Sequence, residues 1–250
     1  MTYIISELCG QWGGSVRRAE QMILQSKMGG ADAVKVQLWD TYRMPGENRE
    51  IWEYLSMNFD QFKRLKEFSD SLNIDFFASP FHSDRFEWIQ ELGLSTNKIA
   101  SSLVDWDIDL CNKMINTGLE TFVSLGCWDK NYLPFEQENV KYFHCVAKYP
   151  HTLDVALDLM PEQFDDRIVG YSDHVIGIDA CVEAVRRGAK VIEKHVKLKG
   201  DNKSHDSKFS MDTEELKSFC RKINLAWETL GTDDLSKRKD IESKKYRRSI

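Results

Sequence analysis

The chain has 250 residues, of which 42% are hydrophobic and 30% charged, with a formal net charge of −6. This composition is typical of a soluble globular protein, and the negative charge disfavours a nucleic-acid partner. No stretch approaches the roughly 20 apolar residues needed to cross a bilayer, and a strand signal at Tyr3 leaves no room for a signal peptide. The six cysteines are scattered without a C-x-x-C pair. We therefore expect a cytoplasmic protein with reduced, packed thiols and no membrane partner.

The first half of the chain alternates strand and helix signals. An apolar strand at residues 3–6 precedes a flexible loop with Gly10, Gly13 and Gly14, and Ser15 is placed to cap the helix that follows. Strands are predicted at residues 33–36, 76–79, 97–100 and 121–124, with helices at 59–72, 84–92 and 109–116. The long loop over residues 38–57 is typical of a functional or disordered segment.

The second half continues the alternation with one interruption. Residues 127–139 contain no convincing amphipathic helix. Strands are then predicted at 140–144, 168–169 and 189–192, and helices at 157–164, 180–187 and 213–230. Eight strands in regular alternation with helices predict an α/β fold, a (β/α)8 TIM barrel with the fifth helix shortened or missing. An open doubly wound sheet is the alternative. We expect the barrel to span residues 1–232 and a charged linker or tail to span 233–250.

Polar side chains stand at or just after the carboxyl end of nearly every predicted strand, where parallel α/β folds bind ligands. They are Glu7, Lys35, Gln37, Ser79, Lys98, Ser101, Ser124, His144, Tyr149, Ser172, His174, Glu193 and His195. The two lysines and several hydroxyls suit an anionic substrate, such as one carrying a phosphate and a carboxylate. His174 and His195 are 21 residues apart, about one βα repeat, and suit a divalent metal with open coordination positions.

Each of these residues also has a structural interpretation. A lone histidine at a strand end is more often hydrogen-bonded than a metal ligand, and the serines could merely cap the following helices. Glu7 could be only the salt-bridge partner of Lys35. Lys98 is harder to explain in this way, because a buried ammonium costs several kcal/mol unless it is paired.

Nine blocks of the sequence resemble the N-acetylneuraminate (sialic acid) synthase family, which includes legionaminate and pseudaminate synthases. They are IISELCGQWGG, ADAVKVQ, FFASPF, KIASS, FVSLG, YFHCVAKYP, VGYSDH, VIEKHVKL and HDSKFSM, in this order over about residues 3–232. The most specific part is GYSDH followed 21 residues later by IEKH, with KIAS upstream. The resemblance implies a barrel that joins phosphoenolpyruvate (PEP) to the aldehyde of an N-acylated amino sugar, giving a 2-keto-3-deoxy acid and phosphate.

The resemblance also implies roles for individual residues. PEP would be bound by Lys35, Ser79, Lys98, Ser101, Ser124 and Ser172, and the amino sugar by Gln37, Tyr149, Glu193 and Asp206. His174 and His195 would hold a divalent metal, Mn2+ first, with Mg2+ or Co2+ as alternatives. The metal would act as a Lewis acid on the aldehyde oxygen, and Glu7 would be the acid–base group.

Three departures from the family pattern bear on activity. Gln11 and Trp12 stand where the family has Asn-His, and Ala147 replaces a polar PEP contact. Residues 233–250 resemble the linker that leads to an antifreeze-like domain in the family, and we expect the given sequence to lack that domain. A homodimer, a monomer and a separate chain that supplies the domain are the alternatives that stay open. Two alternatives stay open: a non-catalytic or partner-dependent barrel that binds PEP or metal without turnover, and a different metal-dependent sugar isomerase or lyase, against which the two lysines argue.

Overall fold

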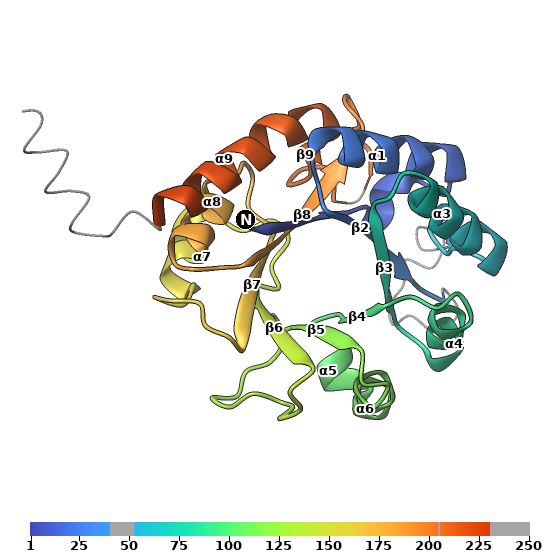
Figure 1. Ribbon diagram of the computed structural model, residues 1–250, viewed down its shortest axis with the longest axis horizontal. Coiled ribbons are helices and arrows are strands. Elements are labelled where there is room, and N and C mark those ends of the chain that lie inside the picture. Colours follow the sequence, from blue (N-terminus) through green and yellow to red (C-terminus); the bar gives the residue numbers. More distant parts are fainter. Residues whose placement is uncertain (41–52, 205, 231–250) are drawn as a thin grey trace, which may run out of the picture.

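A computed structural model describes residues 1–40, 53–204 and 206–230. Eight parallel strands form a ring with helices around it (Figure 1). They are β1 (Tyr3–Glu7), β2 (Ala33–Leu38), β3 (Asp75–Pro80), β4 (Thr96–Ile99), β5 (Glu120–Ser124), β6 (Val140–His144), β7 (Ile168–Asp173) and β8 (Val191–Lys197). The hydrogen-bonded order is β3-β2-β1-β8-β7-β6-β5-β4. Since β3 and β4 are neighbours in the ring, the fold is a nearly closed (β/α)8 TIM barrel, which confirms the prediction.

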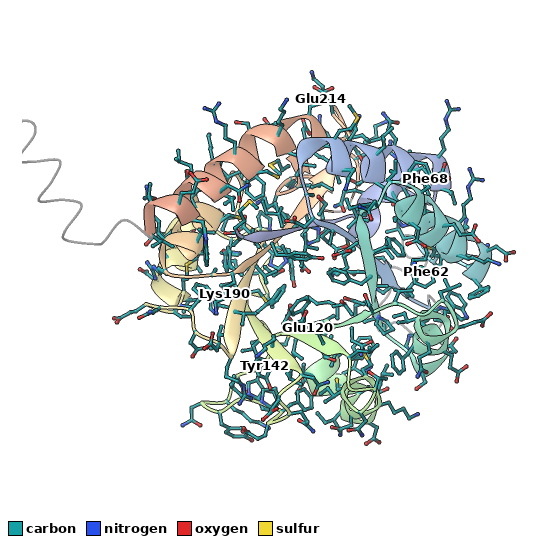
Figure 2. The ribbon with its side chains drawn as sticks, viewed as in Figure 1. Phe62, Phe68, Glu120, Tyr142, Lys190 and Glu214 are labelled. Atoms are coloured by element: carbon teal, nitrogen blue, oxygen red, sulfur yellow. The ribbon has the colours of Figure 1, made fainter. Side chains whose placement is uncertain are left out.

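The helices surround the ring (Figure 1), and the residues that they bury are mainly apolar. They are α1 (Val16–Gly29), α3 (Phe59–Ser71), α4 (Ser83–Glu91), α5 (Leu103–Trp106), α6 (Ile108–Ile115), α7 (Leu153–Leu159), α8 (Asp179–Arg186) and α9 (Leu216–Leu230). Ser15 caps α1 as predicted, because its side chain accepts a hydrogen bond from the Arg18 amide. Phe62 of α3 packs on Phe76 of β3 with ring centroids 5.5 Å apart (Figure 2).

Several smaller elements differ from the predictions. The flexible glycine loop predicted after β1 is instead the buried 3-10 helix η1 (Cys9–Trp12). The helix predicted at residues 157–164 is α7, which ends at Leu159 because Met160 is extended and Pro161 follows it. The helix α5, the short strand β9 (Met211–Asp212), which pairs with β8, and the 3-10 helix η2 (Thr213–Glu215) were not predicted.

A loop takes the place of the fifth helix, as predicted. In the described chain, no helix lies between β5 and β6. The Phe135 side chain of this loop is buried. Its backbone is hydrogen-bonded by Tyr142 of β6, which Figure 2 labels. The Tyr142 hydroxyl donates to the Phe135 carbonyl at 2.7 Å and accepts from the Phe135 amide at 2.9 Å. The buried Phe135 side chain and these hydrogen bonds thus help to hold the segment that replaces a helix.

Strand alternation separates functional from structural side chains on β7 and β8. Glu193 and His195 point into the ring, while Lys194 between them points outward, as successive strand residues do. The Lys194 ammonium lies 2.5 Å from the Asp173 carboxylate, to which the Cys181 thiol of α8 also donates, at 3.3 Å. This buried pair ties the two strands together beneath α8.

Two predicted segments fall outside the described residues. They are positions 41–52 of the long loop and the tail at 233–250, so the predicted division into barrel and linker stays a prediction. Within the described ranges, no helix has the length and apolar character that crossing a membrane requires.

Candidate active site

A cavity of about 370 Å3 lies at the carboxyl ends of the barrel strands, a size suited to a small substrate. The predicted site residues that line it are Lys35, Gln37, Lys98, Ser101, Ser124, Tyr149, Ser172, His174, Glu193, His195 and Asp206. Glu7 and Ser79 do not line it, but each contacts Lys35. The structure therefore brings all the predicted site residues to one end of the barrel. His144 lies outside this cavity, against Tyr171.

Two buried lysines share two buried carboxylates beside the cavity. Lys35 pairs with Glu7, and its Nζ atom also lies 3.5 Å from Oε2 of Glu193. The Nζ atom of Lys98 lies 3.5 Å from the same Glu193 oxygen. All four side chains are at most 5% exposed. Because a buried ammonium is unstable without a counter-charge, this network explains how both lysines are tolerated, and it makes Glu193 their common counter-ion.

The four groups titrate in different directions. Burial raises the pKa of Glu7, although Lys35 opposes the shift. Burial would also raise the pKa of Glu193, but Lys35 and Lys98 outweigh it and lower that pKa to about 2. Burial lowers the pKa of Lys98, whereas Glu193 and Glu7 outweigh burial at Lys35 and raise its pKa. Glu193 is therefore ionised, and Glu7 is the carboxyl group better suited to carry a proton.

The predicted serines bond polar groups of the site. Ser124 accepts a 2.5 Å hydrogen bond from Lys98, and Ser79 accepts one of 3.3 Å from Lys35. Ser172 donates to Glu193 at 2.8 Å, and Ser101 accepts from the Gly126 amide at 3.1 Å. In the described helices none of these serines is the N-cap, so the capping interpretation is wrong for them.

His174 and His195 lie side by side, as their spacing predicts. Their ring centroids are 5.4 Å apart, and the Nδ1 atom of His174 lies 3.1 Å from the Val146 carbonyl oxygen. Burial lowers the pKa of His174 to about 4 and that of His195 well below its ordinary value. Both rings are therefore neutral near pH 7, which is the form that binds metals.

Cys9 is a site residue that the sequence analysis missed. Its thiol donates to Asp206 at 3.1 Å, and the potential ligand atoms of Cys9, His195 and Asp206 all lie within 4.8 Å of one another. Burial and the neighbouring Asp206 raise the pKa of this thiol. The only signal in the sequence was its position two residues after Glu7, at the end of the first strand.

Further residues of the cavity bear on the other expectations. Cys127 and Cys145 line the cavity; Cys145 is buried, as expected of a packed thiol, whereas Cys127 is exposed. Ala147 lines it as well, without a side-chain donor. Gln11 and Trp12 are buried in η1 instead of forming the cavity wall. The departures from the family pattern therefore affect the cavity directly at Ala147 and only indirectly at η1.

Known proteins resemble the chain over most of its length. Residues 22–234 match the sequence model of the NeuB family. An N-acetylneuraminate-9-phosphate synthase of Drosophila melanogaster is 28% identical, over 88% of this chain and 67% of its own. A pseudaminic acid synthase of Campylobacter jejuni is 28% identical, over 99% and 80%. A crystal structure of N-acetylneuraminic acid (sialic acid) synthetase from Leptospira borgpetersenii, in complex with citrate, has a TM-score of 0.83 at 27% identity and covers 100% of this chain and 92% of its own.

Proposed function

The chain belongs to the NeuB family, and on that premise we propose that it condenses PEP with the aldehyde of an N-acylated amino sugar. It is a carbon–carbon-bond-forming transferase, like its relatives named as synthases. The product would be a sialic-acid-like 2-keto-3-deoxy acid. The observation that carries this proposal is the pair of buried lysines, Lys35 and Lys98, facing one cavity. They suit a small substrate that carries both a phosphate and a carboxylate.

We assign the lysine side of the cavity to PEP. PEP carries about three negative charges at neutral pH. Lys35 and Lys98 would pair with these charges as well as with Glu193, their present counter-ion. Ser101, Ser124 and Ser172 line the same cavity, and their hydroxyl groups would donate hydrogen bonds to the substrate oxygens, while Ser79 accepts a hydrogen bond from Lys35.

The proposed reaction balances without an added oxidant or reductant. Carbon 3 of PEP forms a bond to the aldehyde carbon, water adds at carbon 2, and phosphate leaves from carbon 2. The protons of the water go to the new hydroxyl group and to the phosphate. Glu7, whose pKa is raised by burial, is the proposed acid–base group, and it contacts Lys35, which lines the cavity.

A divalent metal fits the residues beside the lysines. Nδ1 of His195 is buried and has no hydrogen-bond partner among the described residues, and His174 lies next to it. We propose that His174 and His195 hold the metal, Mn2+ first, with Mg2+ or Co2+ as alternatives. When bound, the metal would supply Lewis acidity at the aldehyde oxygen.

The remaining polar wall is assigned to the amino sugar. Gln37, Tyr149 and Asp206 line the cavity and offer the amide, hydroxyl and carboxylate groups that bind sugar hydroxyls and an N-acyl group. Glu193 is the exception among the predicted sugar contacts, because it lies between the two lysines. Its contact with the sugar stays a prediction, and its position suggests that it touches both substrates.

The decisive experiment measures phosphate release from PEP with Mn2+, with N-acetylmannosamine and diacetamido-hexoses as acceptors. We expect release with one acceptor class, and its loss in His195→Ala. Lys98→Ala should abolish PEP binding in calorimetry. Lys194→Met is the matched control: it breaks a buried ion pair outside the cavity and should keep PEP binding despite lower stability.

Two outcomes would favour the alternatives. PEP binding without release for any acceptor would indicate a non-catalytic or partner-dependent barrel, and release should then be retested with a separate chain that carries an antifreeze-like domain. Conversion of a sugar without PEP, undiminished in Lys98→Ala, would indicate an isomerase or lyase.

A further inference from the structure

Three buried side chains of different chemistry converge at the edge of the cavity. Cys9 lies just after β1, His195 is on β8 and Asp206 lies in the segment after β8. Cys9 Sγ is 3.1 Å from Asp206 Oδ2, and His195 Nδ1 is 3.9 Å from the same oxygen. Each residue is at most 8% exposed. Three groups that commonly bind metals are thus held around one point by distant parts of the chain.

One ring nitrogen of the histidine in this cluster lacks a hydrogen-bond partner among the described residues. Nδ1 of His195 is inaccessible to solvent and has no hydrogen-bond partner in the described part of the chain. A buried polar atom without a partner is costly, and this one faces the Asp206 carboxylate at a separation too long for a hydrogen bond. A metal ion between the ring and the carboxylate would satisfy it.

The backbone holds Cys9 toward this point in an unusual conformation. Its φ angle is 31°, in the left-handed region that residues other than glycine rarely adopt. Its amide donates to Oε1 of Glu7 at 2.6 Å, which fixes the start of η1. Strained residues cluster at ligand sites, where the surrounding contacts maintain the strain. The strain therefore points to a role for the Cys9 side chain beyond packing.

We propose that Cys9 and Asp206, together with His195, are ligands of a divalent transition metal. The proposal rests on the metal-dependent function proposed above and adds a thiolate and a carboxylate to its ligand set. A sulfur–nitrogen–oxygen set favours Zn2+, Co2+ or Fe2+ over the Mn2+ placed first above, and Mg2+ prefers oxygen ligands alone. His174, the other proposed ligand, lies beside His195. Asp206, predicted to contact the sugar, would then act at the metal.

Co2+ titration of the substrate-free protein tests this proposal, because a cobalt–thiolate bond gives a near-ultraviolet charge-transfer band that nitrogen and oxygen ligands do not give. We expect the band in the wild type and its loss in Cys9→Ser. The affinity for Co2+ should also fall by at least roughly 10- to 100-fold, which is the loss caused by replacing residues that only hydrogen-bond to metal ligands. Cys127→Ser is the matched control. It removes another cavity thiol outside the cluster and should keep the band.

The opposite results would overturn the proposal. They are Co2+ binding without the band in the wild type, or a band and affinity unchanged in Cys9→Ser. If Cys9→Ser does not fold, as judged by circular dichroism, Asp206→Asn provides the test. It should weaken Co2+ binding by about 10- to 100-fold, and unchanged affinity would contradict the ligand assignment. These readouts need no turnover, so wild-type phosphate release without the band would refute the thiolate ligand and leave the proposed function standing.

Discussion

His144 shows how a half-buried histidine couples the stability of the barrel to pH. It ends β6, and its ring stacks on Tyr171 with centroids 6.1 Å apart and an angle of 15° between the planes. Burial, with a smaller contribution from His151, lowers its pKa from 6.5 to about 4. The folded chain therefore resists protonation at a pH where the unfolded chain accepts it.

The free energy of unfolding should fall as the pH drops from 6.5 towards 4. Above pH 6.5 the histidine is neutral in both states, and below that only the unfolded state gains a proton. The full shift corresponds to a loss of up to roughly 3 kcal/mol. Urea unfolding at a series of pH values measures the effect. His144→Phe keeps an aromatic ring against Tyr171 and should make the profile less steep over this window, with the remaining slope due to His174 and His195, whose pKa values burial also lowers. An equally steep profile in the variant would assign the pH dependence to those other groups.

At the residue scale, the sequence indicated which side chains belong to the site better than it indicated which residues they contact. Lys98 could be recognised because an ammonium within an apolar strand requires a counter-charge. Its counter-ion, Glu193, could not be assigned, since the contact depends on how β8 faces β4 across the ring. Cys9 was missed for a related reason. The Cys9 thiol becomes a candidate metal ligand only because the fold places Asp206 and His195 beside it. No spacing between neighbouring residues in the sequence predicts that contact.

At the scale of elements, the loop between β5 and β6 tests how a barrel tolerates a missing helix. Tyr142 satisfies both the amide and the carbonyl of Phe135, and Arg167 donates to the same carbonyl at 2.8 Å. Tyr142→Phe would leave the buried Phe135 amide without its partner. We expect a loss of about 1–3 kcal/mol in unfolding free energy.

The readout for Tyr142→Phe is urea unfolding together with limited proteolysis of residues 125–139. Cleavage there should become faster, while PEP binding on the other strands is kept. Tyr132→Phe is the matched control, because that side chain belongs to the same loop but is exposed. Equal stability and equal cleavage rates in the two variants would show that the Tyr142 hydroxyl does not hold the loop.

The elements themselves were predictable to different degrees. The missing fifth helix was foreseen because residues 127–139 lack helical periodicity, and strands were found because each has a short apolar run. The helix α7 was placed several residues too late because apolar spacing continues past Pro161, which ends the helix near Leu159. The two-residue strand β9 is defined only by its pairing with β8, so no pattern of apolar residues in the sequence predicts it.

At the scale of the whole molecule, the barrel has one seam. Regular alternation of strands and helices predicted the ring, but not where its hydrogen bonding is weakest. Among the described strands, no backbone ladder joins β3 to β4, and these two are the ends of the hydrogen-bonded path. Lys35 on β2 and Lys98 on β4 lie on either side of β3, and Ser79 of β3 contacts Lys35. An anion held by both lysines would bridge the seam.

PEP should therefore slow amide hydrogen exchange most strongly in β3 and β4. Exchange of the seam amides requires an opening that separates the two lysines, and the opened state cannot hold the anion. At a PEP concentration of 100 times Kd, the rates should fall by up to about 100-fold. Amides of β1 and β8, in the unbroken part of the sheet, should change less, and Lys98→Ala should remove the difference. If PEP protected all strands equally, the seam would open only with the whole barrel, and the anion would stabilise the fold as a unit instead of closing its weakest joint.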